Sequence, residues 1–366
     1  MRISLSVDSL DPHLSGIGRY TWELFKGLKR QPNVQLRCFV DDRQAKDPGQ
    51  LLKGPPSTAR RFRRIRAWRD RRALASGLVH GTNFFLPSFA RGGVVTVHDL
   101  SVFKFPETHP PARVQQFASR FEKSISEANH IITDSQAVRN ELIEDFGVAP
   151  TKITPISLGV DKKFRPYRRD ERLQSLSALG LPDHYALCVS TLEPRKRIGE
   201  LMTAWRSLPR ALRDRYPLVL VGSRGWLTES LMQQIDRGMA EGWLLYLGFL
   251  SEAALPAIYS GATLFLYPSM YEGFGLPPLE AMASGTPVLV SRTPCLEELC
   301  GDAAGYLDSV DPETALSAIV EALCDEDWRA RMSSRGVERA RRFSWGQCVE
   351  RTFGVYHQIT ADGGIC

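Results

Sequence analysis

The stretch LFLYPSMYEGFGLPPLEAMASGTPVLVS, residues 264–291, holds the features from which the fold can be predicted. Its first four residues, Leu264 to Tyr267, form a short apolar run that is typical of a buried strand. A glycine-bearing turn follows, and Pro277 suits the first turn of a helix. The apolar run at residues 287–291 predicts the next strand. A strand, a turn, a helix and a second strand in this order predict a βαβ unit.

The same alternation of short apolar runs and helical segments continues along the chain, which predicts an α/β protein with parallel sheets. In the first half the expected strands are residues 3–7, 34–40, 78–80, 94–98, 130–133 and 152–156. In the second half they are residues 185–190, 218–222, 244–247, 264–267, 287–291 and 305–307. A charged stretch with two prolines, residues 160–183, separates the two sets and predicts a linker. We therefore expect one domain over residues 1–165, a second over 166–342, and a last helix within 343–366 that crosses back to the first domain.

The composition is that of an ordinary globular protein, with 43% hydrophobic and 24% charged residues in 366. No run of about 18 apolar residues is present that could span a bilayer. The N-terminus meets an acid at Asp8, where an export signal would need an uninterrupted apolar stretch. The seven cysteines are scattered and form no C-x-x-C pair, so we expect reduced thiols in a cytoplasmic protein and no metal ligands.

The turn and helix start after Tyr267 predict a diphosphate site. Gly273 and Gly275 allow a ligand to approach the backbone, and the free N–H groups of a helix start favour phosphate. Glu272 lies in the turn and Glu280 within the helix, so their carboxylates could reach opposite ends of one extended ligand. The alternative is an ordinary βαβ turn with two solvated glutamates.

The Glu-x7-Glu element and the AMASGTPV sequence at residues 281–288 resemble the signature of family 4 glycosyltransferases. The resemblance implies the GT-B fold, which has two Rossmann-like domains with a cleft between them. It implies that Glu272 contacts the transferring sugar and that Glu280 hydrogen-bonds the ribose of the nucleotide. The backbone amides of residues 274–276, which are Phe274, Gly275 and Leu276, would face the sugar and the phosphates.

A second phosphate element follows the first strand of the second domain, at residues 189–197. Cations at a strand end suit a phosphate at the carboxyl edge of a doubly wound sheet. Lys196 aligns with the family's diphosphate-binding lysine, but Thr191 occupies the position of its arginine, which leaves Arg195 as the replacement charge. This variant resembles a subgroup that includes bacterial mannosyl- and rhamnosyltransferases of O-antigen assembly. A surface charge cluster at a helix start remains the alternative.

Further candidate site residues lie after other strands. In the first domain these are Gly16 and Gly18, which the resemblance places over the donor phosphates, and His98, whose backbone or ring would lie beside the sugar. In the second domain, turns that the family uses around the base contain Gly222, Ser223, Arg224 and Phe249. Arg224 and Phe249 could equally be a surface and a core residue.

The resemblance implies a retaining transferase that uses a nucleoside-diphosphate sugar as substrate and needs neither cofactor nor metal. The subgroup favours GDP-mannose or GDP-rhamnose as the donor, with a UDP-sugar as the alternative, and a glycan or lipid-linked glycan as the acceptor. The Asp-x-Asp triplet of the chain, residues 325–327, lies in an acidic helical region and predicts a solvated surface or a helix cap. The alternative functions on this fold are those of an epimerase, a phosphorylase or a non-catalytic binding protein.

The net charge of +6 is concentrated between Arg60 and Arg72, where eight arginines and one aspartate give +7. Phe62, Ile65 and Trp68 fall three residues apart and predict a narrow apolar stripe on an interfacial helix. We expect this segment to attach the protein peripherally to an anionic membrane surface. A solvated helix that packs on the first domain is the alternative. Nucleic-acid binding is not expected, because no second basic stripe accompanies the cluster.

Overall fold

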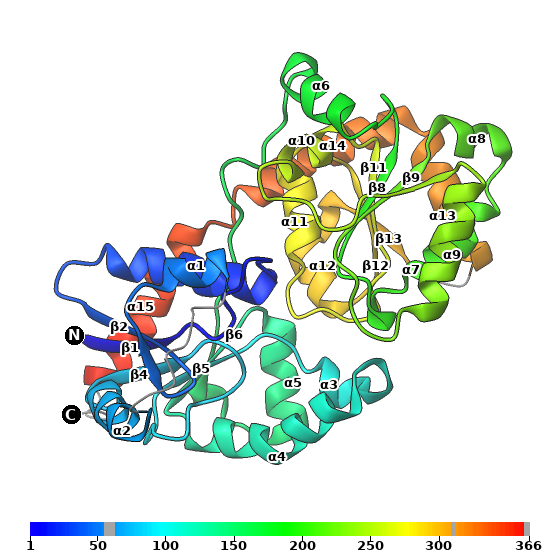
Figure 1. Ribbon diagram of the computed structural model, residues 1–366. Coiled ribbons are helices and arrows are strands. Elements are labelled where there is room, and N and C mark those ends of the chain that lie inside the picture. Colours follow the sequence, from blue (N-terminus) through cyan, green and yellow to red (C-terminus); the bar gives the residue numbers. More distant parts are fainter. Residues whose placement is uncertain (55–62, 309–311, 362–366) are drawn as a thin grey trace. The chain divides into compact units, whose positions relative to one another are not determined.

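The computed structural model describes residues 1–54, 63–308 and 312–361, which fold as two compact units. Unit 1 comprises Met1–Leu100, Val114–Gly159 and Ser344–Cys366, and unit 2 comprises Ser101–Arg113 and Val160–Phe343. Each unit contains its own sheet with helices on both faces (Figure 1).

In the described residues, unit 1 holds a seven-stranded sheet in the order β3-β2-β1-β4-β5-β6-β7. The strands are β1 (Arg2–Ser6), β2 (Gln35–Val40), β3 (Arg43–Ala45), β4 (Leu78–Gly81), β5 (Val94–Val97), β6 (His130–Thr133) and β7 (Ile153–Pro155). β3 pairs antiparallel with β2, and the other printed pairings are parallel. Most positions of β1, β4, β5 and β6 are buried, as expected for strands covered on both faces.

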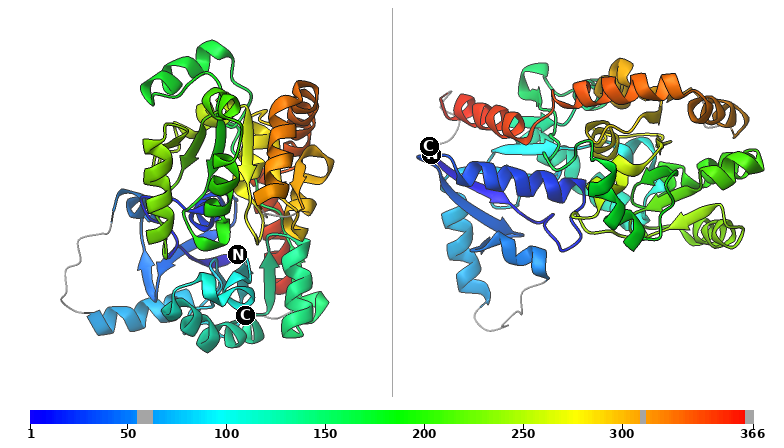
Figure 2. Two further views of the ribbon diagram at one scale, coloured as in Figure 1. Left: turned by 90° about the vertical axis from the view of Figure 1, so that its right-hand side faces the viewer. Right: turned by 90° about the horizontal axis from the view of Figure 1, so that it is seen from above.

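The helices of unit 1 lie on the two faces of this sheet (Figure 1). They are α1 (Gly16–Lys29), α2 (Arg63–Leu74), α4 (Pro111–Glu127), α5 (Gln136–Phe146) and α15 (Trp345–Ala361), with short 3₁₀ helices η1 (Pro48–Lys53) and η3 (Pro150–Lys152). The last helix, α15, packs beside α1, and Figure 2 shows the two running side by side. Its buried Tyr356 hydroxyl lies 2.6 Å from Nδ1 of His80 on β4, which ties the C-terminal helix to the first sheet.

In the described residues, unit 2 holds a six-stranded parallel sheet in the order β10-β9-β8-β11-β12-β13. The strands are β8 (Ala186–Val189), β9 (Leu218–Val221), β10 (Leu244–Tyr246), β11 (Leu264–Tyr267), β12 (Val288–Ser291) and β13 (Gly305–Leu307). The helices are α3 (Ser101–Lys104), α6 (Arg169–Ala178), α7 (Ile198–Arg206), α8 (Arg210–Arg215), α9 (Glu229–Ala240), α10 (Leu255–Gly261), α11 (Leu276–Ala283), α12 (Pro294–Cys300), α13 (Pro312–Cys324) and α14 (Glu326–Ala340). Single turns are η2 (Pro106–Thr108), η4 (Pro194–Lys196) and η5 (Gly301–Ala303).

The strand order of unit 2 reverses at the carboxyl edge between β8 and β11, which we call the switch point of the sheet. These two strands are hydrogen-bonded neighbours, but β8 is followed by α7 on one face and β11 by α11 on the other (Figure 1). The buried core on the α7 face includes Trp205 and Ile319 of α13. Loops that leave adjacent strands toward opposite faces leave room for a ligand between them. The fold therefore brings the loop after β8 and the loop after β11 to one place.

The expected α/β class with two parallel sheets is confirmed, and every expected strand is present with ends that differ by at most one residue. The sequence analysis did not find β3, since Arg43–Ala45 contains no apolar run. β3 forms because a two-residue turn reverses the chain after Val40, and Asp41 adopts the left-handed φ of 54° that such hairpin turns need.

The segment Ser101–Arg113 groups with unit 2, although the sequence analysis expected it in the domain over residues 1–165. Its contacts explain the grouping: Trp226 Nε1 donates a hydrogen bond of 2.7 Å to the carbonyl oxygen of Thr108, and the rings of Phe105 and Tyr271 lie 5.7 Å apart. No apolar periodicity marks these long-range contacts in the sequence.

Candidate active site

The loops after β8 and β11 bring three charged side chains into one cluster. Lys196 Nζ donates to Glu272 Oε1 at 2.5 Å, and Arg195 Nη1 lies 3.3 Å from the same oxygen. Lys196 Nζ also donates to the hydroxyl oxygen of Tyr267, the last residue of β11, at 3.0 Å. Two cations thus share one carboxylate oxygen at the switch point of the sheet.

Hydrogen bonds to backbone carbonyl oxygens hold the two loops against each other. The amide of Met270 donates to the carbonyl oxygen of Arg195 at 3.0 Å, and Arg195 Nη1 donates to the carbonyl oxygen of Tyr271 at 2.5 Å. Pro194 opens the single turn η4, and Arg197 takes a left-handed φ of 51° that ends the turn and begins α7. The cations therefore lie on a short rigid segment and not on a free loop.

Burial makes this cluster electrostatically strong. The side chains of Arg195, Lys196 and Glu272 are each 10% exposed, and Glu193 Oε2 lies 3.7 Å from Arg195 Nη2. Burial alone would raise the pKa of Glu272, but the cations of Lys196 and Arg195 outweigh it and lower that pKa below its ordinary value. Glu272 is therefore held ionised beside two cations in a buried site.

The helix start after this cluster has the predicted form. Gly275 precedes α11 with a φ of 110°, a conformation that favours glycine, and Pro277 lies in the first turn. A Cβ at Gly275 would also lie 2.9 Å from Leu296 Cδ2. Phe274 is buried, with its ring centroid 5.9 Å from that of Phe343. Glu280 lies in the second turn of α11 and is buried.

The turns after β9 and β10 adjoin the loop after β8 at the same edge of the sheet. Gly222 has a φ of 147°, and a Cβ there would lie 1.8 Å from the carbonyl oxygen of Ser190, so this close approach requires glycine. The carbonyl oxygen of Ser223 accepts from the amide of Leu192 at 3.0 Å. Arg224 Nε donates to Thr228 Oγ1 at 3.0 Å, and Phe249 is 43% exposed. The roles of these residues toward a nucleoside stay predictions.

In unit 1, His98 follows β5 and is locked by protein contacts. Its Nδ1 lies 2.7 Å from Asp134 Oδ2 at the end of β6, and its Nε2 donates to the carbonyl oxygen of Thr82 at 2.8 Å. Burial lowers the pKa of His98, but Asp134, the Thr82 carbonyl and Asp99 together outweigh burial and raise that pKa, and burial raises the pKa of Asp134 itself. Because both ring nitrogens are engaged, this geometry favours a role for the backbone of His98 over one for its ring.

The glycines at the start of α1 have a structural explanation. Gly18 N donates to Ser15 Oγ at 3.3 Å in an N-cap, and a Cβ at Gly18 would lie 2.7 Å from the carbonyl oxygen of Ser9. Gly16 is the exposed first residue of the helix. A contact of this loop with donor phosphates stays a prediction.

The structure thus brings Arg195, Lys196 and Glu272 together, and it adds Tyr267 and Asp134, which the sequence analysis did not single out. Tyr267 ends an apolar run and gives the pattern of a core residue. Asp134 follows the strand end HIIT, and only its pairing with His98 distinguishes it from a helix-capping aspartate.

Two observations concern metals and membranes. Within the described ranges, no group of three His, Cys, Asp or Glu side chains is placed to hold a metal ion. The Asp325 carboxylate accepts from the amide of Trp328 at 2.7 Å and caps α14, which is the cap predicted for residues 325–327. Among the helices of the described residues, none combines the length and apolar character that crossing a bilayer requires.

Comparison with known proteins identifies the family. The family described as glycosyl transferases group 1 matches residues 173–339, and glycosyltransferase family 4 matches residues 14–164. An Escherichia coli protein described as O-antigen chain mannosyltransferase B is 36% identical, over 97% of this chain and 99% of its own. The chain belongs to glycosyltransferase family 4.

The transferase has further relatives in sequence and structure. The Salmonella typhimurium O-antigen chain mannosyltransferase RfbU is 30% identical over 68% of the transferase and 66% of its own chain. The crystal structure of Anabaena Alr3699/HepE in complex with UDP-glucose matches with a TM-score of 0.76 at 19% identity, over 97% of this chain and 100% of the other. The second likeness supports the GT-B fold of the transferase and no more.

Proposed function

We propose that this transferase moves a mannosyl residue from GDP-mannose to a glycan acceptor in the synthesis of a cell-surface polysaccharide. The observation that carries this proposal is the contact of Lys196 and Arg195 with one oxygen of Glu272 at the β8–β11 switch point. It offers two cations for a diphosphate and a carboxylate for a sugar hydroxyl at one place. The choice of mannose is supported by the two relatives described as O-antigen chain mannosyltransferases.

In this proposal the Glu272 carboxylate pairs with the two cations until the diphosphate of the donor binds to them. Without a ligand, this carboxylate compensates the buried cation of Lys196 and, together with Glu193, that of Arg195. A bound diphosphate supplies its own anionic oxygens to Lys196 and Arg195. Glu272 then loses part of its attraction to them and accepts a hydrogen bond from a hydroxyl of the transferring sugar.

The proposed mechanism depends on stabilising the diphosphate as the leaving group. When the bond between the anomeric carbon and the diphosphate breaks, charge accumulates on the phosphate oxygen, where Lys196, Arg195 and the start of α11 stabilise it. The acceptor hydroxyl attacks from the face that the diphosphate leaves and gives its proton to the departing phosphate oxygen, which retains the anomeric configuration. These cations replace a metal ion in stabilising the leaving group, so the proposed reaction is metal-independent.

Two alternatives share the site. A UDP-sugar would place uracil in the base region, and the solved relative holds UDP-glucose. An epimerase or a binding protein would use the same cluster without transfer. The guanine donor is proposed because the Glu193-Pro194-Arg195-Lys196 sequence resembles the mannosyl- and rhamnosyltransferase subgroup.

The acceptor is proposed to be lipid-linked, with α2 attaching the protein peripherally to an anionic membrane surface. Arg60, Arg61 and Phe62 lie outside the described residues, as do the side chains of Ile65 and Trp68. In the described part of α2, Arg71 is half-exposed and forms an ion pair with Asp42. Co-sedimentation with anionic liposomes, compared with a variant that has Arg60, Arg63, Arg64 and Arg71 changed to Ser, tests the attachment.

The enzyme assay uses a panel of GDP- and UDP-sugars with a mannose-terminated acceptor, with and without EDTA, and determines the anomer formed by NMR. The expected result is an α-linked mannosyl product from the α-configured GDP-mannose, at a rate that excess EDTA leaves unchanged. A β-linked product contradicts retention, and loss of activity that magnesium restores contradicts the metal-independent mechanism. Release of nucleoside diphosphate without a new glycoside contradicts transfer.

A further inference from the structure

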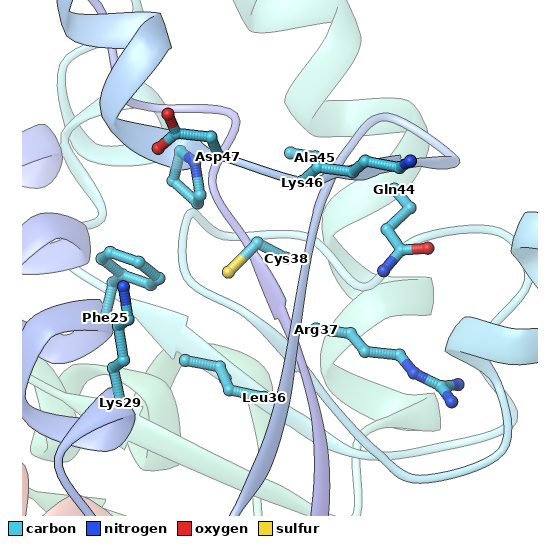
Figure 3. Close-up of a pocket in the computed structure, with 10 residues that line it drawn as sticks. Phe25, Lys29, Leu36, Arg37, Cys38, Gln44, Ala45, Lys46 and Asp47 are labelled. Carbon is cyan, nitrogen blue, oxygen red and sulfur yellow. The ribbon is translucent and has the colours of Figure 1, made fainter.

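Cations are arranged differently in the two units. In unit 1, Lys29 and Lys46 line a cavity of about 450 Å³, but Figure 3 shows them on opposite sides of β2. In unit 2, Lys196 Nζ has two acceptors within hydrogen-bond distance at the carboxyl end of β11. One acceptor is the carboxylate of Glu272, and the other is the hydroxyl of Tyr267. Unit 2 therefore holds this cation between two side chains.

Tyr267 is the last residue of β11, and its side chain is held in place from several directions. Tyr267 is paired with Val290 of β12 in the parallel sheet. Its ring stacks on that of Phe265, which lies two residues earlier on the same face of the strand, with ring centroids 6.0 Å apart. Only 2% of Tyr267 is exposed. Its hydroxyl therefore has a fixed position at the edge of the sheet.

Both the hydroxyl and the ring of Tyr267 contact Lys196. Lys196 Nζ donates to the hydroxyl oxygen at 3.0 Å and lies 5.3 Å from the centroid of the ring, which is a cation–π distance. Burial, and after it the charge of Glu272, raise the pKa of the Tyr267 hydroxyl well above its ordinary value. The hydroxyl is therefore neutral, and its oxygen offers a lone pair to the ammonium.

The ammonium of Lys196 has three N–H donors, and contacts within the protein use two of them. One donates to Glu272 Oε1 at 2.5 Å and another to the hydroxyl of Tyr267. Within the part of the chain that the structure describes, Nζ has no third acceptor. The two fixed acceptors determine the direction in which the remaining N–H points.

We propose that Tyr267 is a positioning residue for the reaction, because its hydroxyl keeps the Lys196 ammonium directed at the diphosphate of the donor. This inference rests on the proposed exchange of Glu272 for the diphosphate. When the carboxylate of Glu272 leaves Nζ, the hydroxyl of Tyr267 is the acceptor that Lys196 retains. A neutral hydroxyl does not repel the incoming phosphate, as a second carboxylate at this place would. Tyr267 therefore acts through Lys196 and not on the substrate.

The test is a double-mutant cycle of Tyr267→Phe and Lys196→Met, with kcat for transfer and the affinity for the nucleoside diphosphate as the two measurements. Tyr267→Phe keeps the buried ring and removes the acceptor. Tyr185→Phe is the matched control, because Tyr185 is also buried and its hydroxyl donates to the carbonyl oxygen of Ile258 on α10 at 2.6 Å. Thermal unfolding of each variant checks its folding.

Tyr267→Phe is expected to lower kcat about tenfold and to weaken nucleoside-diphosphate binding severalfold, as for the loss of one hydrogen bond to a charged group. In the Lys196→Met background the same change should alter neither quantity by more than about twofold, because the cation that Tyr267 positions is absent. Tyr185→Phe should leave kcat and the affinity within about twofold of the parent protein in both backgrounds.

Two outcomes would overturn the role of Tyr267. One is an equal loss for Tyr267→Phe with and without Lys196, since a hydroxyl that only stabilises the fold has the same effect in both backgrounds. The other is a Tyr267→Phe protein with the kcat and the affinity of wild type. If none of the nucleotide sugars gives a glycoside, the proposed transfer falls, and nucleoside-diphosphate binding across the same cycle still decides the role of Tyr267.

Discussion

Each unit has a buried ion pair at the carboxyl end of its parallel strands, but the two pairs differ in what they leave for a ligand. In unit 2, Lys196 and Arg195 both contact one oxygen of Glu272. In unit 1, His98 has one nitrogen on Asp134 and the other on the carbonyl oxygen of Thr82. In the proposed mechanism the first pair exchanges its carboxylate for a phosphate, whereas in the second pair both ring nitrogens already have partners within the protein.

This difference follows from the side chains involved. A lysine has three N–H donors and an arginine five, so these cations can take phosphate oxygens as additional or replacement acceptors. An imidazole has two ring nitrogens, and both are engaged in unit 1. The sequence marks both Lys196 and His98 as candidate site residues. We therefore propose that Lys196 acts on the ligand and that the side chain of His98 supports the sheet edge.

The largest effect is expected for Lys196→Met, which removes the cation and keeps much of the stem. The rate constant for transfer should fall about 10²- to 10³-fold, as for the loss of one preorganised donor to a developing charge. Steady-state release of nucleoside diphosphate measures it. Arg206→Met on the following helix is the control, because its guanidinium lies on the surface in a pair with Glu241. Equal rates for the two variants would remove Lys196 from the chemistry.

Variants of the two glutamates should affect different quantities, one the rate of transfer and the other the affinity for the nucleotide. Glu272→Gln is expected to lower the rate of transfer and keep the affinity for the nucleoside diphosphate, whereas Glu280→Gln should weaken that affinity. Each loss should correspond to about 1–3 kcal/mol, the range for a hydrogen bond to a charged group. Steady-state kinetics and calorimetry on both variants check the split, and the reverse pattern would exchange the assigned roles.

The pair of His98 and Asp134 in unit 1 should contribute to the stability of the fold and not to the reaction. The pKa of His98 is raised above 6.5 and that of Asp134 above 3.8, so the folded state binds more protons than the unfolded state. The stabilising contribution of protonated His98 is present below pH 6.5 and is lost as the pH rises through its folded pKa. Asp134→Asn should therefore lower the free energy of unfolding by about 1–2 kcal/mol at pH 6 and by less at pH 9.

Urea unfolding at the two pH values measures this contribution, with the exposed Glu144 of α5 changed to Gln as the control. If the unfolding free energy lost in Asp134→Asn were larger at pH 9 than at pH 6, protonated His98 would not be the source of the contribution. A tenfold loss of transfer without a change in stability would instead give the His98 side chain a direct part in the reaction.

The smallest effect is expected for the contribution of Glu272, paired with Lys196 and Arg195, to the free energy of unfolding at acid pH. The pKa of Glu272 is lowered below 4.5, so its contribution to stability is present above pH 4.5 and is lost as the pH falls through the folded pKa. The difference in unfolding free energy between wild type and Glu272→Gln should shrink by about 1 kcal/mol between pH 6 and pH 3. A difference that stays constant would mean that Glu272 is not held ionised by Lys196 and Arg195.

Much of the fold was predictable because parallel strands that are buried on both faces give short apolar runs. The runs at residues 264–267 and 130–133 match β11 and β6 in full. β3 was not predictable because its residues, Arg43–Ala45, are held by a turn and an edge pairing and not by burial. Long-range contacts such as Trp226 with Thr108 leave no periodic pattern.

The residues of the candidate site that belong to a continuous sequence motif were predictable. Those whose role depends on a contact between distant parts of the chain were not. The spacing from Glu272 to Glu280 and the cations at residues 195–196 are visible in the sequence. The partner of His98 is not, because Asp134 is 36 residues away and meets it only through the pairing of β5 with β6. The same pairing explains why a histidine that matched a functional position proves to have both nitrogens occupied.

The exchange of Glu272 for phosphate is the central claim, and calorimetry tests it most directly. The titrants are the nucleotide sugar that supports transfer and its nucleoside diphosphate, and the proteins are wild type, Lys196→Met and Glu272→Gln. Lys196→Met is predicted to weaken both ligands about tenfold or more. Glu272→Gln is predicted to bind the nucleoside diphosphate at least as tightly as wild type and to lose the extra affinity contributed by the sugar. Unchanged affinity of Lys196→Met for both ligands, or an equal loss of both by Glu272→Gln, would contradict the account.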